Sequence, residues 1–399
     1  MGAIEEIPEE LAVLGEKSGV QREEPDEEAL QEPFDPQEIS IASKGISLDA
    51  VIRRINTNTI RLSPDFQRNV VWDNKRKSLL IESLMLNIPI AMFYVSDDGK
   101  GNWEVVDGLQ RLTAIKEFIV DKKFKLEKLE FWTQYNGKGL DDLPPIPYNQ
   151  IMETEFNFVI IQPTTQDVIK YNIFKRINTG GLPLSNQEIR HALYQGEGTK
   201  LLYEYSLSDI FLLATDRSIN DSRMVARELI LRCLTFMILG TDGYASNDTM
   251  DTFLNKGLRI LNFLENPHDK RLEKDYGKKL LESLSIKNYK TLKQLFDLGM
   301  TRNFEIFDKN AFRISLQNQP RSPINKSLFE TWGGLLASLS ESDFRKLMKK
   351  KDTLLSQYDK KKKEENFYRA VSRDAWKKSN VDYRFTEVSK LIWGTINDK

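Results

Sequence analysis

The fold of this chain is organised around one short stretch, Trp103-Glu104-Val105-Val106-Asp107-Gly108-Leu109-Gln110-Arg111-Leu112-Thr113. Its first residues are rich in strand formers, and Gly108 permits a sharp turn directly after them. Beyond the turn, Leu112, Ile115 and Phe118 share one face at helical spacing. We therefore predict a strand that ends near Asp107 and a helix that starts just after it.

Three polar side chains lie at this predicted junction, namely Asp107, Gln110 and Arg111. The first turn of a helix has backbone N–H groups without intrahelical partners, so it favours anions, and Gly108 allows close backbone approach. Arg111 offers a fork of donors that matches phosphate, and Asp107 is the kind of ligand that Mg²⁺ prefers. Gln110 is suited to orienting an attacking water. The cluster therefore predicts a catalytic phosphate site with Asp107 as its metal ligand.

Two other stretches carry side chains of the same kind. Gln67 and Arg68 lie in a polar loop, where Arg68 offers a second guanidinium for phosphate and Gln67 a second amide for water. Arg176 ends a predicted helix, and Asn178-Thr179-Gly180-Gly181 follows it with amides suited to a second phosphate cradle. Two structural alternatives stay open. Glycines end helices for ordinary reasons, and Asp107 can pair with Arg68 or Arg176 to tie a loop to the sheet.

Ser185 and Glu188 have the spacing of a helix capping box, in which each side chain bonds to the other residue's backbone N–H group. We expect a helix to begin there, with a ligand or metal role for Glu188 as the alternative. His191 follows on the same predicted helix. We interpret it as an ordinary surface or packing residue, with general-base chemistry as its alternative.

The composition excludes several classes of protein. The chain has 399 residues, enough for two domains, and its apolar and charged fractions are those of a soluble globular protein. A single cysteine, Cys233, excludes a disulfide framework. With two histidines, we expect no cysteine or histidine metal site and no HNH nuclease centre. No apolar run has membrane-spanning length and the acidic N-terminus does not read as a signal peptide, so we expect a cytoplasmic protein.

The order of predicted elements divides the chain into three parts. Residues 1–40 are rich in Glu, Asp and Pro, which predicts an acidic disordered tail. Residues 41–200 alternate short strands with helices, whereas residues 201–399 show helical patterns only, including 278–297 and 341–358. The predicted fold class is α+β, with a small mixed β-sheet and flanking helices followed by an all-helical domain.

The C-terminal part also carries a basic row that is a candidate for contacts to DNA phosphates, made of Lys349, Lys350, Lys351, Lys360, Lys361 and Lys362. Acidic residues are interspersed with these lysines. Solvated helix ends are therefore an equally good interpretation of the row.

Three motifs in this chain resemble the N-terminal domain of GmrSD-type modification-dependent restriction enzymes (domain of unknown function 262), of the ParB/sulfiredoxin-like superfamily. The motifs are Phe66-Gln67-Arg68 with Val71-Trp72, Val106-Asp107-Gly108-Leu109-Gln110-Arg111-Leu112-Thr113, and Phe174-Lys175-Arg176-Ile177-Asn178-Thr179-Gly180-Gly181 with Leu184 and Glu188-Ile189-Arg190. The resemblance spans residues 45–195. It implies an α+β core that binds nucleoside triphosphates and, in some members, hydrolyses them in anti-phage DNA restriction. The usual family motif is Asp-Gly-Gln-Gln-Arg, from which this chain departs at Leu109.

Two functions of different classes follow. The first is a Mg²⁺-dependent NTPase that acts in defence and takes GTP or ATP. The second is a DNA-binding or regulatory module without catalysis, which recruits a separate nuclease subunit or works as a homo-oligomer. A nuclease centre within the α+β core is a third interpretation, with few carboxylates to support it.

Overall fold

The computed structural model describes residues 7–12, 15–23, 39–62, 72–165, 167–177, 184–266 and 268–398. The chain divides into two compact units. One unit comprises Pro33–Leu193, and the other combines Met1–Glu32 with Tyr194–Lys399. We refer to them as the sheet unit and the helical unit.

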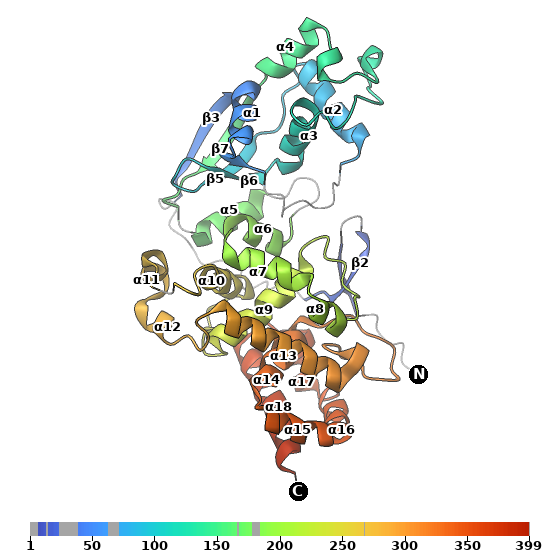
Figure 1. The fold of residues 1–399 in the computed structure, drawn as a ribbon, viewed down its shortest axis with the longest axis vertical. Helices are drawn as coiled ribbons and strands as arrows, with labels where there is room; N and C mark the ends of the chain where they lie inside the picture. Colours follow the sequence, from blue (N-terminus) through green and yellow to red (C-terminus); the bar gives the residue numbers. More distant parts are fainter. Residues whose placement is uncertain are drawn as a thin grey trace. The chain divides into compact units, whose positions relative to one another are not determined.

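A five-stranded sheet organises the sheet unit, with the strand order β3-β7-β5-β6-β4 (Figure 1). The strands are β3 (Ile41–Ser47), β4 (Ile60–Arg61), β5 (Phe93–Asp97), β6 (Trp103–Asp107) and β7 (Glu155–Ile161). The pairs β3–β7 and β5–β6 are antiparallel, whereas β5–β7 and β4–β6 are parallel. The predicted small mixed sheet and the α+β class are confirmed.

Strands β5 and β6 are joined by a tight turn over residues 98–102. The Asp98 carboxylate accepts hydrogen bonds from the backbone N–H groups of Lys100 (2.8 Å) and Asn102 (3.1 Å). This side-chain contact fixes the turn without help from the rest of the chain. The returning strand β6 then carries the chain to Asp107.

The described residues of the sheet unit form the helices α1 (Leu48–Asn56), α2 (Asn74–Met85), α3 (Leu109–Ile119), α4 (Pro145–Glu153), α5 (Asp167–Ile177) and α6 (Asn186–Leu193). One face of α3, made of Leu112, Ile115 and Phe118, is buried in the core with residues of β5, β6 and β7. Each such side chain contributes about 1.5–3 kcal/mol when fully buried. The apolar face read from the sequence therefore anchors α3, and with it the start of the helix, to the sheet.

The described residues of the helical unit form α7 (Glu197–Ser206), α8 (Asp209–Ala214), α9 (Val225–Leu239), α10 (Met250–Asn262), α11 (Lys270–Tyr276), α12 (Lys278–Glu282), α13 (Tyr289–Phe307), α14 (Lys326–Ser338), α15 (Glu341–Lys349), α16 (Lys351–Lys361), α17 (Glu365–Ser372) and α18 (Lys378–Asn397). The helices expected over 278–297 and 341–358 are each broken in two. The first break occurs because the Asn288 side chain accepts a hydrogen bond from the Thr291 N–H group (2.8 Å) and caps a new helix.

The N-terminal residues correct one prediction. Residues 1–40 were expected to form a disordered tail, but β1 (Glu9–Leu11) and β2 (Lys17–Gln21) form an antiparallel hairpin of the helical unit. Val20 is fully buried, and the Gln21 N–H group donates to the Ile324 carbonyl (2.7 Å). Acidic side chains of this segment bond to buried cations, and composition alone does not reveal such partners. Residues 1–6, 13–14 and 24–38 of the predicted tail lie outside the described ones.

Those cations lie on the helices of the same unit. Glu23 accepts hydrogen bonds from both terminal nitrogens of Arg232, at 2.6 and 3.0 Å. Arg232 also donates to Glu330 (2.7 Å), which in turn pairs with Arg384. Arg232, Glu330 and Arg384 are almost completely buried. The hairpin therefore completes a buried ionic network, and removing one partner of such a network is costly.

Candidate functional site

The junction between β6 and α3 has the predicted geometry of strand, glycine turn and helix. Gly108 has φ +96° and precedes the first residue of α3. A Cβ atom at this position would lie 2.3 Å from a ring carbon of Phe93. Both the left-handed backbone and the close ring therefore require glycine here.

Arg111 is held by four groups around its guanidinium. Its Nη2 donates to Asp107 Oδ2 (2.9 Å) and to the Met92 carbonyl (3.2 Å), and its Nη1 donates to the Ala91 carbonyl. The guanidinium carbon lies 4.5 Å from the centre of the Phe93 ring, a cation–π contact. The side chain is only 14% exposed. Arg111 therefore ties α3 to the residues that lead into β5, and it is not a free phosphate ligand in this state.

Asp107 forms the open side of this pair, because its side chain is 39% exposed. Burial lowers the pKa of Arg111 from its ordinary value, and the nearby Asp107 charge opposes that shift. Ile88 and Met92, in the segment between α2 and β5, are exposed at 46% and 47%. Solvent therefore meets a fixed carboxylate beside an apolar strip, which suits a ligand with both polar and apolar parts.

The predicted capping box at the start of α6 is present. The Ser185 N–H group donates to Glu188 Oε2 (2.6 Å), and the Glu188 N–H group donates to Ser185 Oγ (3.1 Å). Glu188 is 1% exposed. Its carboxylate therefore satisfies the helix start, as expected from the spacing.

Helix α6 also buries polar residues that the sequence analysis did not single out as site residues. Gln187 and Arg190 are fully buried, and Arg190 Nη1 donates to Gln187 Oε1 (2.5 Å). His191, interpreted as an ordinary residue, is 2% exposed. The sequence feature that could have indicated them is the run of polar residues around the core residue Ile189. Four buried polar side chains on one short helix are costly without partners.

Helix α6 packs against α5 and β6, so this polar row lies on elements next to the strand that ends at Asp107. Their shared apolar cluster includes Val106, Phe174 and Ile189. Arg176 is exposed in the last turn of α5, and Gln110 is half-buried in the first turn of α3. The structure thus brings Asp107, Gln110 and Arg111 together. Six other predicted site residues lie outside the described ones, namely Gln67, Arg68, Asn178, Thr179, Gly180 and Gly181.

The basic row predicted for DNA is only partly a free surface. Lys362 is buried and donates to Gln319 Oε1 (2.7 Å) and the Ile314 carbonyl (3.0 Å). The five other lysines of the row divide into two kinds. Lys350 and Lys351 donate to backbone carbonyls and Lys361 pairs with Glu364 and Glu387, whereas Lys349 and Lys360 are exposed. Helix packing therefore turns Lys362 inward, and DNA contact by the other lysines of the row stays a prediction.

The described part of the chain has neither a cluster of metal-ligating side chains nor a membrane-spanning helix. No group of three or more His, Cys, Asp and Glu side chains there has an arrangement that holds a metal ion. Within the same residues, no helix is both long and apolar enough to cross a membrane.

Comparison with known proteins identifies the domain that carries the site. Residues 50–195 match the family described as GmrSD restriction endonuclease, N-terminal domain. No curated protein and no solved structure matches the chain. This part of the chain is therefore similar to a GmrSD N-terminal domain, which is consistent with the ParB/sulfiredoxin-like superfamily and suggests a role in restriction or anti-phage defence.

Proposed function

We propose that the sheet unit binds a nucleoside triphosphate with Mg²⁺ and hydrolyses it as part of a DNA restriction or anti-phage defence system. The observation that carries this proposal is the fixed, part-exposed Asp107 carboxylate at the start of α3. A carboxylate held by a buried guanidinium offers one ligand to Mg²⁺, which takes its other ligands from water and substrate phosphates.

The neighbouring residues take distinct roles in this proposal. Gly108 brings the backbone N–H groups at the start of α3 close to a phosphate, and Gln110 orients the attacking water. Arg111 acts mainly as a positioning residue, because its donors bond to Asp107 and to the Ala91 and Met92 carbonyls. The exposed strip beside Met92 then contacts the base or sugar of the nucleotide.

For the remaining predicted phosphate ligands, the support is the match of residues 50–195 to the family domain. They are Gln67, Arg68, Arg176, Asn178, Thr179, Gly180 and Gly181. The substitution of Leu109 for the glutamine usual in the motif leaves Gln110 as the amide for water at this turn. We also propose that DNA cleavage, where it follows, is performed by a separate nuclease subunit, because the chain has only two histidines for an HNH centre.

A thermal-shift panel with GTP, ATP and Mg²⁺ tests the proposal. At one hundred times Kd, a ligand that binds only the folded state stabilises it by about 2.7 kcal/mol. We expect a Mg²⁺-dependent rise in Tm for the wild-type protein and its loss in Asp107→Asn. The matched control is Asp49→Asn, which breaks an exposed i,i+4 pair with Arg53 on α1 and should keep the full shift. Absence of a shift with every nucleotide contradicts the proposal, and phosphate release then tests hydrolysis.

The alternative of a DNA-binding module predicts a different result in the same preparation. DNA affinity would fall steeply with salt, survive Asp107→Asn and weaken when the exposed Lys349 and Lys360 are changed to Gln. DNA binding that is independent of salt, or absent, removes this alternative.

A further inference from the structure

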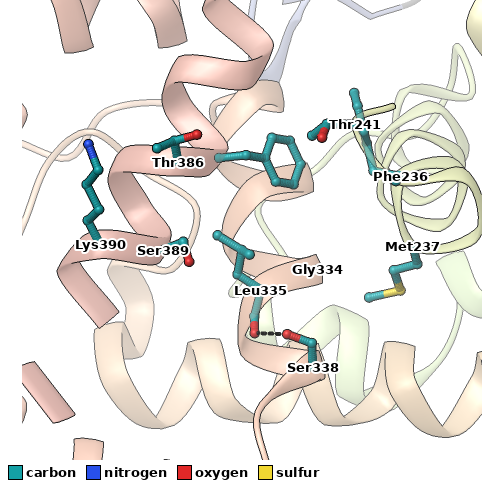
Figure 2. Close-up of a pocket in the computed structure, with 11 residues that line it drawn as sticks. Phe236, Met237, Thr241, Gly334, Leu335, Ser338, Thr386, Ser389 and Lys390 are labelled. Atoms are coloured by element: carbon teal, nitrogen blue, oxygen red, sulfur yellow. Dashed lines mark hydrogen bonds between the residues drawn. The ribbon is translucent and has the colours of Figure 1, made fainter. Parts of the chain in front are cut away.

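A cavity lies within the helical unit (Figure 2). It is bounded by the C-terminal end of α9, by α14 and by α18. Its volume is about 540 Å³, within the range of roughly 300–1,000 Å³ typical of small-molecule sites. It is a widely open hollow at the surface rather than an enclosed cavity. The lining residues are Phe236, Met237, Gly240, Thr241, Gly334, Leu335, Ser338, Phe385, Thr386, Ser389 and Lys390.

Two glycines create part of this space. A Cβ atom built on Gly334, in the middle of α14, would have no neighbour within 4 Å, and the same holds for Gly240 just after α9. Glycine inside a helix costs about 0.5–1 kcal/mol relative to alanine. Gly334 therefore leaves unfilled a space that a larger side chain would fill while favouring the helix.

The cavity carries hydroxyl groups that are not used by the helices themselves. Hydroxyls of helical Ser and Thr often donate to a preceding carbonyl, as Thr395 does to Leu391 (2.8 Å). Among the described residues, no hydrogen bond is formed by the hydroxyls of Thr386 and Ser389, which lie along the α18 side of the cavity (Figure 2). These two hydroxyls are therefore available as donors and acceptors to a bound molecule.

Lys390, also on α18, supplies a positive charge at this side of the cavity. Its ammonium group is 2.8 Å from Glu387 Oε1, and its side chain is 69% exposed, so this pair is weak. Glu387 has a second cationic partner in Lys361, at 2.9 Å. Lys390 can therefore turn to an anionic ligand without leaving Glu387 unpaired.

Apolar and aromatic side chains complete the lining, with Phe385 on α18 and Phe236 on α9. The rings of Phe236 and Phe385 lie 5.1 Å apart at 41°, and Leu335 and Met237 extend the same surface. Phe236 is buried, whereas the part-exposed Phe385 can contact a planar ring, and hydroxyls bond to ring edges or sugars. We propose that this cavity binds a planar ring that carries a phosphate, namely a mononucleotide, either free or at the end of a DNA strand. The site is separate from Asp107 and does not depend on the function proposed for the sheet unit.

Binding of adenosine 5′-monophosphate, measured by calorimetry on the full chain, tests this site. Gly334→Leu should fill the cavity and weaken binding at least about tenfold, since most contacts of a small ligand are lost on steric exclusion. Gly394→Leu on α18 is the matched control. It is also a helical glycine whose Cβ would meet nothing within 4 Å, but it does not line the cavity, so it should bind as wild type does.

Further probes separate the parts of the proposal. Lys390→Met should weaken binding of the monophosphate about tenfold but leave adenosine unchanged, because only the phosphate contact is removed. Tight binding of a 5′-phosphorylated single-stranded oligonucleotide identifies DNA as the source, whereas binding of the free nucleotide alone identifies a metabolite. Asp107→Asn should change none of these values, which distinguishes this site from the one in the sheet unit.

Three results would overturn the proposal. They are no saturable binding of any probe to the wild-type protein, equal affinities of Gly334→Leu and Gly394→Leu, and binding of inorganic phosphate as tight as that of the nucleotide. The last result would mean that the ring makes no contribution. A melting temperature for Gly334→Leu at or above that of wild type shows that any loss of binding is not caused by unfolding.

Discussion

Arg111 of α3 donates at 2.9 Å to Oδ2 of Asp107, the last residue of β6, and the same guanidinium donates to the carbonyls of Ala91 and Met92 on the segment before β5. The pair is unequal in exposure, with Arg111 at 14% and Asp107 at 39%. The guanidinium therefore stabilises the fold, and the carboxylate is the group that is accessible to solvent and ligands. This division separates the stability effects of the site from its chemistry.

We predict that Arg111→Ala lowers the free energy of unfolding by about 1.5–3 kcal/mol, because the Ala91 and Met92 carbonyls and the Asp107 carboxylate lose a charged donor. Arg111→Lys should recover part of this loss, since one ammonium replaces the charge but cannot reach all three acceptors. Arg53→Ala, which breaks an exposed i,i+4 pair on α1, should cost at most about 0.5 kcal/mol. Urea unfolding measures all three, and equal values for Arg111→Ala and Arg53→Ala would contradict the positioning role.

Gly108→Ala should destabilise the protein by about 2 kcal/mol more than Gly101→Ala. Both glycines have positive φ, at +96° and +86°, so alanine is strained at either position. Only at Gly108 does the new Cβ collide with the Phe93 ring, whereas nothing lies within 4 Å at Gly101. Thermal unfolding of the two variants isolates the cost of the collision, and an equal loss would show that the ring moves freely.

Glu23→Gln should lower the stability of the helical unit by about 2–3 kcal/mol, because it leaves the buried Arg232 short of one counter-charge. Glu16→Gln in the same hairpin should cost less than about 0.5 kcal/mol, since Glu16 is exposed and its partner is a neutral amide. Chemical unfolding compares the two. If the variants were equally stable, the hairpin would not be an integral part of the unit.

Glu23 also makes the stability of the helical unit depend on pH. Burial raises the pKa of Glu23, but the charge of Arg232 outweighs this, so the folded-state pKa lies below the ordinary value of 4.5. The stabilisation is therefore fully present above the unfolded-state pKa and is lost as the pH falls through the folded-state value. We expect the stability gap between wild type and Glu23→Gln to be constant from pH 7 to about 5 and to shrink below it. A gap that widens in acid would reverse this assignment.

Lys362→Met should cost about 1–3 kcal/mol, because Gln319 and the Ile314 carbonyl lose their donor in a buried setting. The exposed Lys349→Met should change stability by less than about 0.5 kcal/mol. Urea unfolding at low and high salt makes the comparison. If Lys362→Met left the stability unchanged, Lys362 would again be a candidate for the DNA surface.

The sequence alone predicted the features that depend on near neighbours in the chain. The turn at Gly108 and the capping box of Ser185 with Glu188 are both decided by residues a few positions apart. Backbone sterics and local hydrogen bonds act over that range, so their patterns survive in the sequence.

Only the tertiary structure decided which charged groups are used by the fold. Arg111 meets carbonyls that lie 19 and 20 residues away, Arg232 meets Glu23 across 209 residues, and Lys362 turns inward rather than toward solvent. Composition described the N-terminal residues as a free acidic tail because it contains no information about distant cations. The energy of a charge depends on its burial and its partners, and these are set by how the helices and strands pack.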